Sequence, residues 1–87
     1  YKESFHRIAV MMEELIAAIA RSLVDQPDAV KVTRTDEEDS VTIELAVAPE
    51  DLGKVIGKQG RTARALRSIL AAAAEKVDKR SRLEIIE

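Results

Sequence analysis

The stretch V-I-G-K-Q-G-R, from Val55 to Arg61, contains the residues best suited to bind an anion. Two of the three glycines in the chain, Gly57 and Gly60, flank Lys58 and Gln59. Glycine adopts backbone angles that other residues avoid, and it lets a ligand approach the main chain closely. A cation and an amide between two glycines would add charge and hydrogen bonds. The spacing therefore predicts a tight turn that binds an anionic group.

Basic residues surround this turn. Residues 52 to 74 carry five basic side chains and no acidic one, whereas residues 1 to 51 carry five basic against twelve acidic. A solvated helix face is the simpler alternative, but such a face usually mixes charges of both signs. At about 100° per residue, the three arginines share one helix face opposite the apolar stripe. We predict that the basic set contacts an anion, and its members are Lys54, Lys58, Arg61, Arg64 and Arg67.

The same residues disfavour a cofactor and a catalytic role. The pattern G-x-x-x-G-x-x-G, which begins at Gly53, is neither the dinucleotide fingerprint nor the P-loop, and it joins two helices rather than following a strand. The chain has no cysteine, and His6 is its one histidine. The acidic run from Asp36 to Asp39 is interpreted as a solvated turn rather than a metal site. We therefore expect no catalytic residue, no metal and no cofactor.

Length and composition predict one small domain. A chain of 87 residues with 46% hydrophobic and 34% charged residues can bury a single modest core. It contains no apolar run of about 18 residues and no cysteine, so we expect a cytoplasmic protein. Met11 or Met12 would suit an initiator, so residues 1 to 11 are interpreted as an upstream extension or as residues added by cloning. Residues 12 to 87 are predicted to form the domain.

The elements that must position the basic turn follow from hydrophobic periodicity. A helix is predicted before Pro27, and its apolar face contains Ile8, Met12, Leu15, Ile16, Ile19 and Leu23. Residues 29 to 34 and 41 to 47 alternate as two strands of a hairpin. Pro49 begins a short helix that ends at Ile56. A last helix starts at Arg61, and its apolar face contains Leu66, Ile69, Leu70, Ala73, Ala74 and Val77.

The final segment, residues 82 to 87, is predicted to be a strand, so the order is helix, strand, strand, helix, helix, strand. The connection between the second and third strands has the length and helical content of a crossover, which predicts that these strands are parallel. The first strand should pair with the second in the antiparallel sense. The predicted fold is α+β, with a three-stranded mixed sheet and three helices on one face.

At this point the residues resemble a known family. Ile56, Gly57, Lys58, Gln59 and Gly60, placed between two short helices and followed by basic residues, resemble the G-x-x-G signature of the KH domain. The element order is similar to the type II, prokaryotic arrangement. The run from Ala48 to Arg67 resembles small bacterial proteins that consist of one KH domain and little else. The resemblance covers residues 12 to 87.

The resemblance implies a fold and a set of contacts with single-stranded RNA. The turn and the start of the following helix would clamp the phosphates, with Lys58 adding charge and Gln59 adding hydrogen bonds. Bases would lie in an aliphatic groove, for which the candidates are Val55, Ile56, Leu83 and Ile85. Lys79 and Arg80 would line the opposite rim. The residues of this groove are not aromatic, so weak binding with little sequence preference is expected.

The resemblance also implies partners and leaves rival functions open. Such proteins pair with themselves or with a larger RNA-binding protein of Jag type, and roles as post-transcriptional regulators, RNA chaperones or ribosome-associated factors follow by analogy. Ile86 would then lie on the outer sheet face. A protein-interaction module and a helix-hairpin-helix module that binds DNA remain alternatives. The flanking strands disfavour the latter.

Overall fold

The computed structural model describes residues 2 to 86. Tyr1, in the predicted extension, and Glu87, in the predicted last strand, lie outside the described residues. The order of elements is the predicted one. Its helices and strands are α1 (Lys2–Leu23), β1 (Lys31–Asp36), β2 (Ser40–Ala46), α2 (Leu52–Ile56), α3 (Arg61–Glu75) and β3 (Arg80–Ile86). Single 3-10 turns precede β1, α2 and α3 at Pro27–Ala29, Pro49–Asp51 and Lys58–Gly60.

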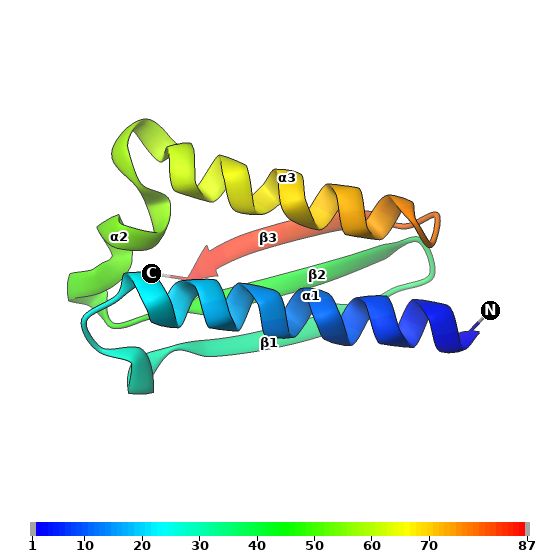
Figure 1. The fold of residues 1–87 in the computed structure, drawn as a ribbon, viewed down its shortest axis with the longest axis horizontal. Helices are drawn as coiled ribbons and strands as arrows, with labels where there is room; N and C mark the ends of the chain where they lie inside the picture. Colours follow the sequence, from blue (N-terminus) through cyan, green and yellow to red (C-terminus); the bar gives the residue numbers. More distant parts are fainter. Residues whose placement is uncertain (1, 87) are drawn as a thin grey trace.

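The three strands form one mixed sheet in the order β1-β2-β3. β1 pairs with β2 in the antiparallel sense, and β2 pairs with β3 in the parallel sense. Both pairings were predicted. The crossover between the parallel strands contains α2 and α3, and α1 and α3 lie side by side over the same face of the sheet (Figure 1). The α+β fold with three helices on one face is confirmed.

The core lies between this helix layer and the sheet. In β2 the residues Val41, Ile43 and Leu45 are fully buried, and they alternate with partly exposed residues as the sequence pattern requires. Met12 and Ile16 of α1 and Leu66 and Leu70 of α3 belong to the same buried cluster, so both helices cover this face of β2. On β3, Leu83 and Ile85 face this core and Ile86 faces outward, as predicted.

The first turns of α1 are part of this packing. Ala9 is buried, and Phe5 and Ile8 pack against the core. The Lys79 ammonium lies 5.0 Å from the centre of the Phe5 ring. Residues before Met12 therefore contribute apolar contacts to the domain. Within residues 2 to 86, no helix is both long and apolar enough to cross a membrane.

Two residues that periodicity assigned to the core are exposed. Leu23 is the last residue of α1, and the next residue, Val24, turns inward and takes its place while its N–H still bonds the carbonyl of Ala20. Ile69 lies at one margin of the apolar arc of α3, and the helix is rotated so that Ala63 and Ala74 at the other margin are buried instead. Small residues at that margin let α3 approach its neighbours closely.

Candidate nucleic-acid interface

The turn between α2 and α3 has the backbone geometry that its glycines predict. Gly57 ends α2 at φ 81° and ψ 168°, and Gly60 precedes α3 in the left-handed region at φ 74°. Gln59 is also left-handed, at φ 56° and ψ 25°. A side chain other than asparagine or aspartate is uncommon in this region, and the cost is about 1–2 kcal/mol. The turn therefore stores strain beside its exposed face.

Gly57 is the position at which no side chain fits. A Cβ on Gly57 would lie 2.8 Å from the backbone nitrogen of Thr62 and 2.7 Å from the Thr62 Cβ. Both distances are below any normal contact, and the backbone of α3 cannot move away without unwinding its first turn. A Cβ on Gly60 would meet nothing within 4 Å. Gly60 is therefore needed only for its positive φ, whereas Gly57 is needed for φ and for space.

Some of the donors expected at the start of α3 are already used. The N–H of Gly60 donates to the carbonyl of Gly57, and the N–H of Arg61 donates to the carbonyl of Lys58. These bonds close the 3-10 turn. The N–H of Arg61 is therefore not available to an anion, while the side chains of Lys58, Gln59 and Arg61 are exposed.

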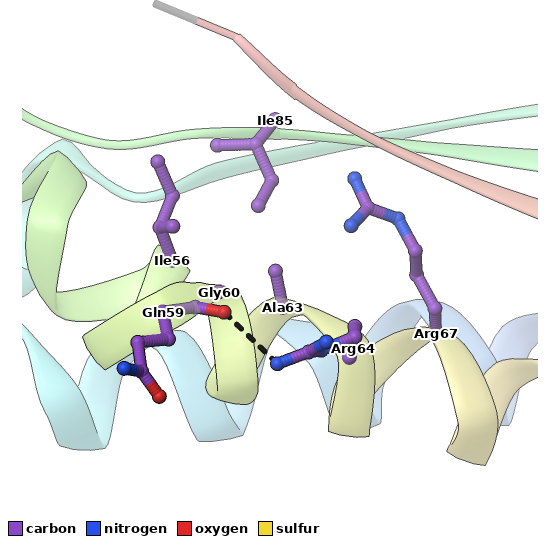
Figure 2. Close-up of a pocket in the computed structure, with 7 residues that line it drawn as sticks. All are labelled: Ile56, Gln59, Gly60, Ala63, Arg64, Arg67 and Ile85. Carbon is purple, nitrogen blue, oxygen red and sulfur yellow. Dashed lines mark hydrogen bonds between the residues drawn. The ribbon is translucent and has the colours of Figure 1, made fainter.

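The turn opens onto a groove between α3 and β3. The first hollow of this groove has a volume of about 370 Å³. Its floor is aliphatic, because Ile56, Ala63 and Ile85 converge on it from α2, α3 and β3 (Figure 2). Gln59 and Gly60 form one end, and Arg64 and Arg67 form the side. A second hollow of about 420 Å³ continues along β3, and its lining is Arg67, Ala71, Ser81, Arg82, Leu83 and Glu84.

The two arginines of the groove bond backbone carbonyls. Arg64 turns toward the glycine turn and donates from Nη2 to the carbonyl of Gln59 at 2.9 Å, whereas Arg67 extends toward β3 (Figure 2). Arg67 donates from Nη2 to the carbonyl of Leu83 at 3.3 Å. Arg64 therefore places positive charge against the strained turn. Arg67 spans the groove and lines both hollows.

Several predicted contact residues lie elsewhere. Val55 is fully buried in the core and Leu83 is 5% exposed, so the Val55 side chain cannot contact a base and Leu83 presents mainly its backbone. Lys54 lines neither hollow, since its ammonium pairs with the carboxylates of Asp25 at 3.3 Å and Asp51 at 3.4 Å. Ile56 and Ile85 do line the groove, as predicted.

Lys79 and Arg80 do not form the opposite rim. They follow the C-terminal end of α3, whereas the glycine turn precedes its N-terminal end, and the 15 residues of α3 separate the two. At about 1.5 Å per residue, that helix is roughly 20 Å long. Lys79 instead donates to the carbonyl of Glu38 in the β1–β2 hairpin. The parallel arrangement of β2 and β3 imposes this separation, because the crossover must return to the start of β3.

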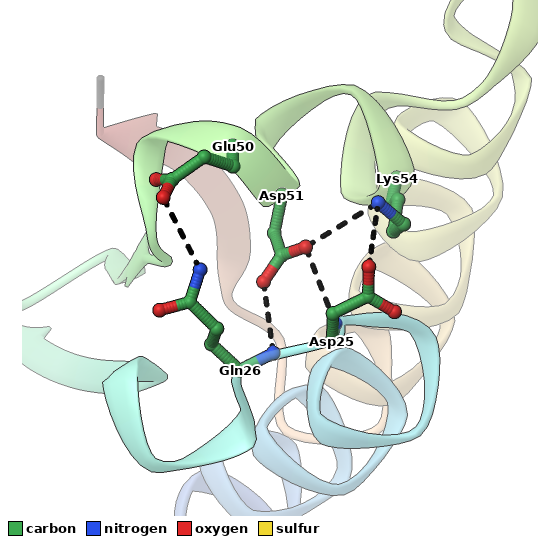
Figure 3. A network of polar contacts seen from close by, with 5 residues as sticks. All are labelled: Asp25, Gln26, Glu50, Asp51 and Lys54. Atoms are coloured by element: carbon green, nitrogen blue, oxygen red, sulfur yellow. Dashed lines mark hydrogen bonds and ion pairs between the residues drawn. The ribbon is translucent and has the colours of Figure 1, made fainter.

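A buried carboxylate holds α2 against the end of α1. Asp51 is 1% exposed and accepts hydrogen bonds from the backbone N–H groups of Asp25, at 3.2 Å, and Gln26, at 3.0 Å. Lys54 completes the network, and Gln26 also donates to Glu50 at 3.4 Å (Figure 3). Among the described residues, Asp51 is the one charged side chain in the core. It anchors the helix that leads into the glycine turn.

The network determines the charge state of Asp51. Burial alone would raise the pKa of Asp51, but the N–H groups of Asp25 and Gln26 and the ammonium of Lys54 together outweigh it, so the pKa lies below the ordinary value of 3.8. The carboxylate of Asp25, followed by that of Asp51, raises the pKa of Lys54 above 10.5. Both groups are therefore charged at neutral pH, and each stabilises the other.

Sequence reasoning missed three features of this region. Ala63 forms part of the groove floor, Arg82 lines the second hollow, and Asp51 is a buried anchor. Arg82 has a weak signal in the sequence, because it follows Arg80 by two positions in a segment that alternates like a strand. Asp51 directly follows Pro49 and Glu50, where an acidic residue is usual at an exposed helix start. Nothing local distinguishes it from its exposed neighbour.

The three glycines should form a graded series when each is replaced by alanine. Gly53 lies in α2 with open space around it, so Gly53→Ala should stabilise the fold by about 0.5–1 kcal/mol. Gly60→Ala should cost about 1 kcal/mol for its positive φ. Gly57→Ala should cost more than Gly60→Ala, because the clash with Thr62 adds to the same backbone cost. Urea denaturation measures all three, and equal stability of the Gly57 and Gly60 variants would contradict the close approach at Thr62.

The Asp51 anchor predicts a pH dependence. A carboxyl group whose pKa is lowered by folding stabilises the protein above its unfolded pKa, and this contribution is lost as the pH falls below about 3.8. Asp51→Asn should be less stable at pH 7 and should lose less stability than the wild type between pH 5 and pH 2. Thermal denaturation across this range tests the difference. Parallel curves for the two proteins would exclude a special role for Asp51 in acid unfolding.

Comparison with known proteins agrees with this geometry. The family model described as "KhpA/KhpB, KH domain" matches residues 13–85. The RNA-binding protein KhpA of Halalkalibacterium halodurans is 57% identical over 76 residues, which cover 87% of this chain and 100% of the relative. The KhpA protein of Clostridium acetobutylicum is 56% identical, over 86% of this chain and 100% of the relative. The KhpA protein of Aquifex aeolicus is 53% identical, over 87% of this chain and 96% of the relative. No solved structure shows a significant match. The chain belongs to the KhpA/KhpB family of KH-domain proteins.

Proposed function

We propose that this chain binds single-stranded RNA without catalysing a reaction. The observation that carries the proposal is the glycine turn opening onto a groove with an aliphatic floor and arginines along its side. A KH domain clamps about four nucleotides with such a loop. The relatives named above are called RNA-binding proteins, which supports the same function here.

Each part of the site has a distinct role in this proposal. The backbone at Gly57 and Gly60, with the side chains of Lys58, Gln59 and Arg61, contacts the phosphates. Ile56 and Ile85 support the bases, and Arg64 adds charge beside the turn. Phosphate contacts provide affinity without sequence information. Lys54, Val55, Lys79 and Arg80 are left out, because the structure places them in ion pairs, in the core or at the far end of α3.

The groove favours a single strand over a duplex. Bases must leave a helical stack before they can rest on aliphatic side chains. Tyr1 and Phe5 are the only aromatic residues of the chain, and Phe5 packs against the core, so base stacking contributes little. Affinity for one short RNA should therefore be modest. Duplex DNA, the ligand of a helix-hairpin-helix module, should bind more weakly than single-stranded RNA.

We further propose a cytoplasmic, post-transcriptional role in which the domain acts as a dimer or with a larger Jag-type protein. One groove covers few nucleotides, so a second RNA-binding surface would raise affinity through effective concentration. Ile86, which is 43% exposed on the outer face of β3, is one candidate contact between copies. RNA-chaperone or ribosome-associated activity would follow from the same binding. Identifying the RNA that the protein binds would distinguish between these roles.

Reversing the charge of the turn tests the binding site. Lys58→Asp with Gln59→Asp should abolish binding to a single-stranded RNA, because two carboxylates would face the phosphates. Folding should be preserved, since both side chains are exposed and aspartate tolerates the left-handed angles of residue 59. Fluorescence anisotropy with a labelled oligonucleotide measures the effect.

The matched control is His6→Asp with Arg7→Asp. Both residues are exposed near the start of α1. Like the first variant, it replaces one cation and one neutral side chain by two carboxylates, but at a distance from the groove, and it should keep most of the affinity. If both double variants lose affinity equally, overall charge rather than the glycine turn accounts for binding.

Self-association is tested at Ile86. Ile86→Asp should shift a concentration-dependent dimer toward monomer in sedimentation equilibrium, and it should lower the affinity for a long RNA more than for a short one. Leu23→Asp changes a residue of similar exposure, 39% against 43%, at the end of α1 and serves as the control. A wild-type protein that is strictly monomeric at all concentrations and binds long RNA with full affinity would refute the proposed dimer.

A further inference from the structure

Arg67 occupies a different environment from the other arginines of α3. Arg61 lies next to the glycine turn and is exposed. Arg67 lies almost two helical turns further along and reaches across the groove to the Leu83 carbonyl. It is the one side chain that lines both described hollows of the groove. Any strand that follows the groove away from the turn must therefore pass its guanidinium.

The strand opposite Arg67 exposes its backbone to the groove. The N–H of Arg80 bonds the carbonyl of Asp39, which shows that Arg80 directs its backbone groups toward β2. Because these directions alternate along a strand, Ser81, Leu83 and Ile85 direct theirs outward. The bond from Arg67 to the Leu83 carbonyl agrees with this alternation. Arg67 is therefore fixed beside an open row of donors and acceptors.

This position is suited to a base rather than to a phosphate. The floor beside Arg67 is formed by aliphatic side chains, and the glycine turn, where the proposed function places the phosphates, lies at the other end of the first hollow. A guanidinium has five N–H donors in a rigid plane. One Nη2 proton is used on Leu83, and the remaining donors can form a pair of parallel hydrogen bonds with a base edge.

We propose that Arg67 is the specificity-determining residue of the groove and that it selects guanine or cytosine over adenine and uracil. Guanine presents two adjacent acceptors at O6 and N7, and cytosine presents two at O2 and N3. On the corresponding edges, adenine has a donor at N6 beside the N7 acceptor, and uracil has a donor at N3 beside the O2 acceptor. Each of these bases therefore accepts only one bond from the planar guanidinium. A good bidentate pair favours its base by about 5- to 150-fold. The inference rests on the proposed RNA-binding function.

The test uses four RNA heptamers, UUUNUUU, in which the central base is varied. Binding of each to the full chain is measured by fluorescence anisotropy, at two salt concentrations. The wild type should prefer N as G or C by at least about 5-fold over A or U. Arg67→Ala should bind all four RNAs alike. Arg61→Ala should weaken all four equally and keep the preference, and it should reduce the log–log salt slope by about 0.7.

Arg67→Lys separates specificity from stability. Arg67→Ala removes the bond to the Leu83 carbonyl and should lower the melting temperature. Lysine keeps a positive charge and a donor for this carbonyl, so Arg67→Lys should restore the melting temperature. It lacks the planar pair of donors, so the preference for G and C should stay reduced. A merely structural role for Arg67 predicts that Lys restores both properties.

Three results would overturn the inference. One is a wild type that binds the four heptamers equally, another is an Arg67→Ala protein that keeps the ranking, and the third is an Arg67→Lys protein with full preference. In each case the Lys58→Asp, Gln59→Asp variant reports separately on the proposed function. If that variant loses RNA binding, the site stands and only the role of Arg67 falls. A wild type that binds none of the RNAs refutes both.

Discussion

The close approach of Gly57 to Thr62 is the constraint on which the arrangement of the site depends. It brings the end of α2 against the first turn of α3, at a distance that no side chain on residue 57 would allow. With that contact made, only the four residues 58 to 61 are left to reverse the chain, and Gln59 adopts a left-handed conformation. Strain of this kind persists only where the surrounding structure compensates for it. Here the Arg64 bond to the Gln59 carbonyl and the packing of α3 provide the compensation.

Asp51 provides the second constraint, at the other end of α2. This helix has only five residues and could not hold its orientation by its own hydrogen bonds. A buried carboxylate that accepts hydrogen bonds from two N–H groups just after the end of α1, those of Asp25 and Gln26, ties it to the longest helix of the domain. The lowered pKa of Asp51 keeps the acceptor charged at neutral pH. The glycine turn therefore connects two helices that are both held in place. It can be exposed to solvent and still keep a defined conformation.

Charge is divided between structural and binding roles within one segment. Residues 52 to 74 contain five basic side chains that look alike in the sequence, but the fold gives them different partners. Lys54 neutralises the carboxylates at the Asp51 anchor, and Arg64 and Arg67 bond backbone carbonyls at the two sides of the groove. Lys58 and Arg61 are exposed beside the turn. A basic segment of this kind can therefore stabilise the domain and leave cations available to an anionic ligand.

The sequence by itself determined the element order, the mixed sheet, the glycine turn and the family, because apolar periodicity and backbone-restricted glycines act over short stretches of chain. Only the tertiary structure decided which residues meet across the groove. Val55 and Ile56 are neighbours in the chain, yet packing buries one and leaves the other at the groove floor. Lys79 and Arg80 lie at the far end of α3 from the glycine turn, because a parallel crossover must span the length of the sheet. The roles of Asp51 and Arg67 depend on partners about 25 and 16 residues away, and no local pattern specifies such contacts.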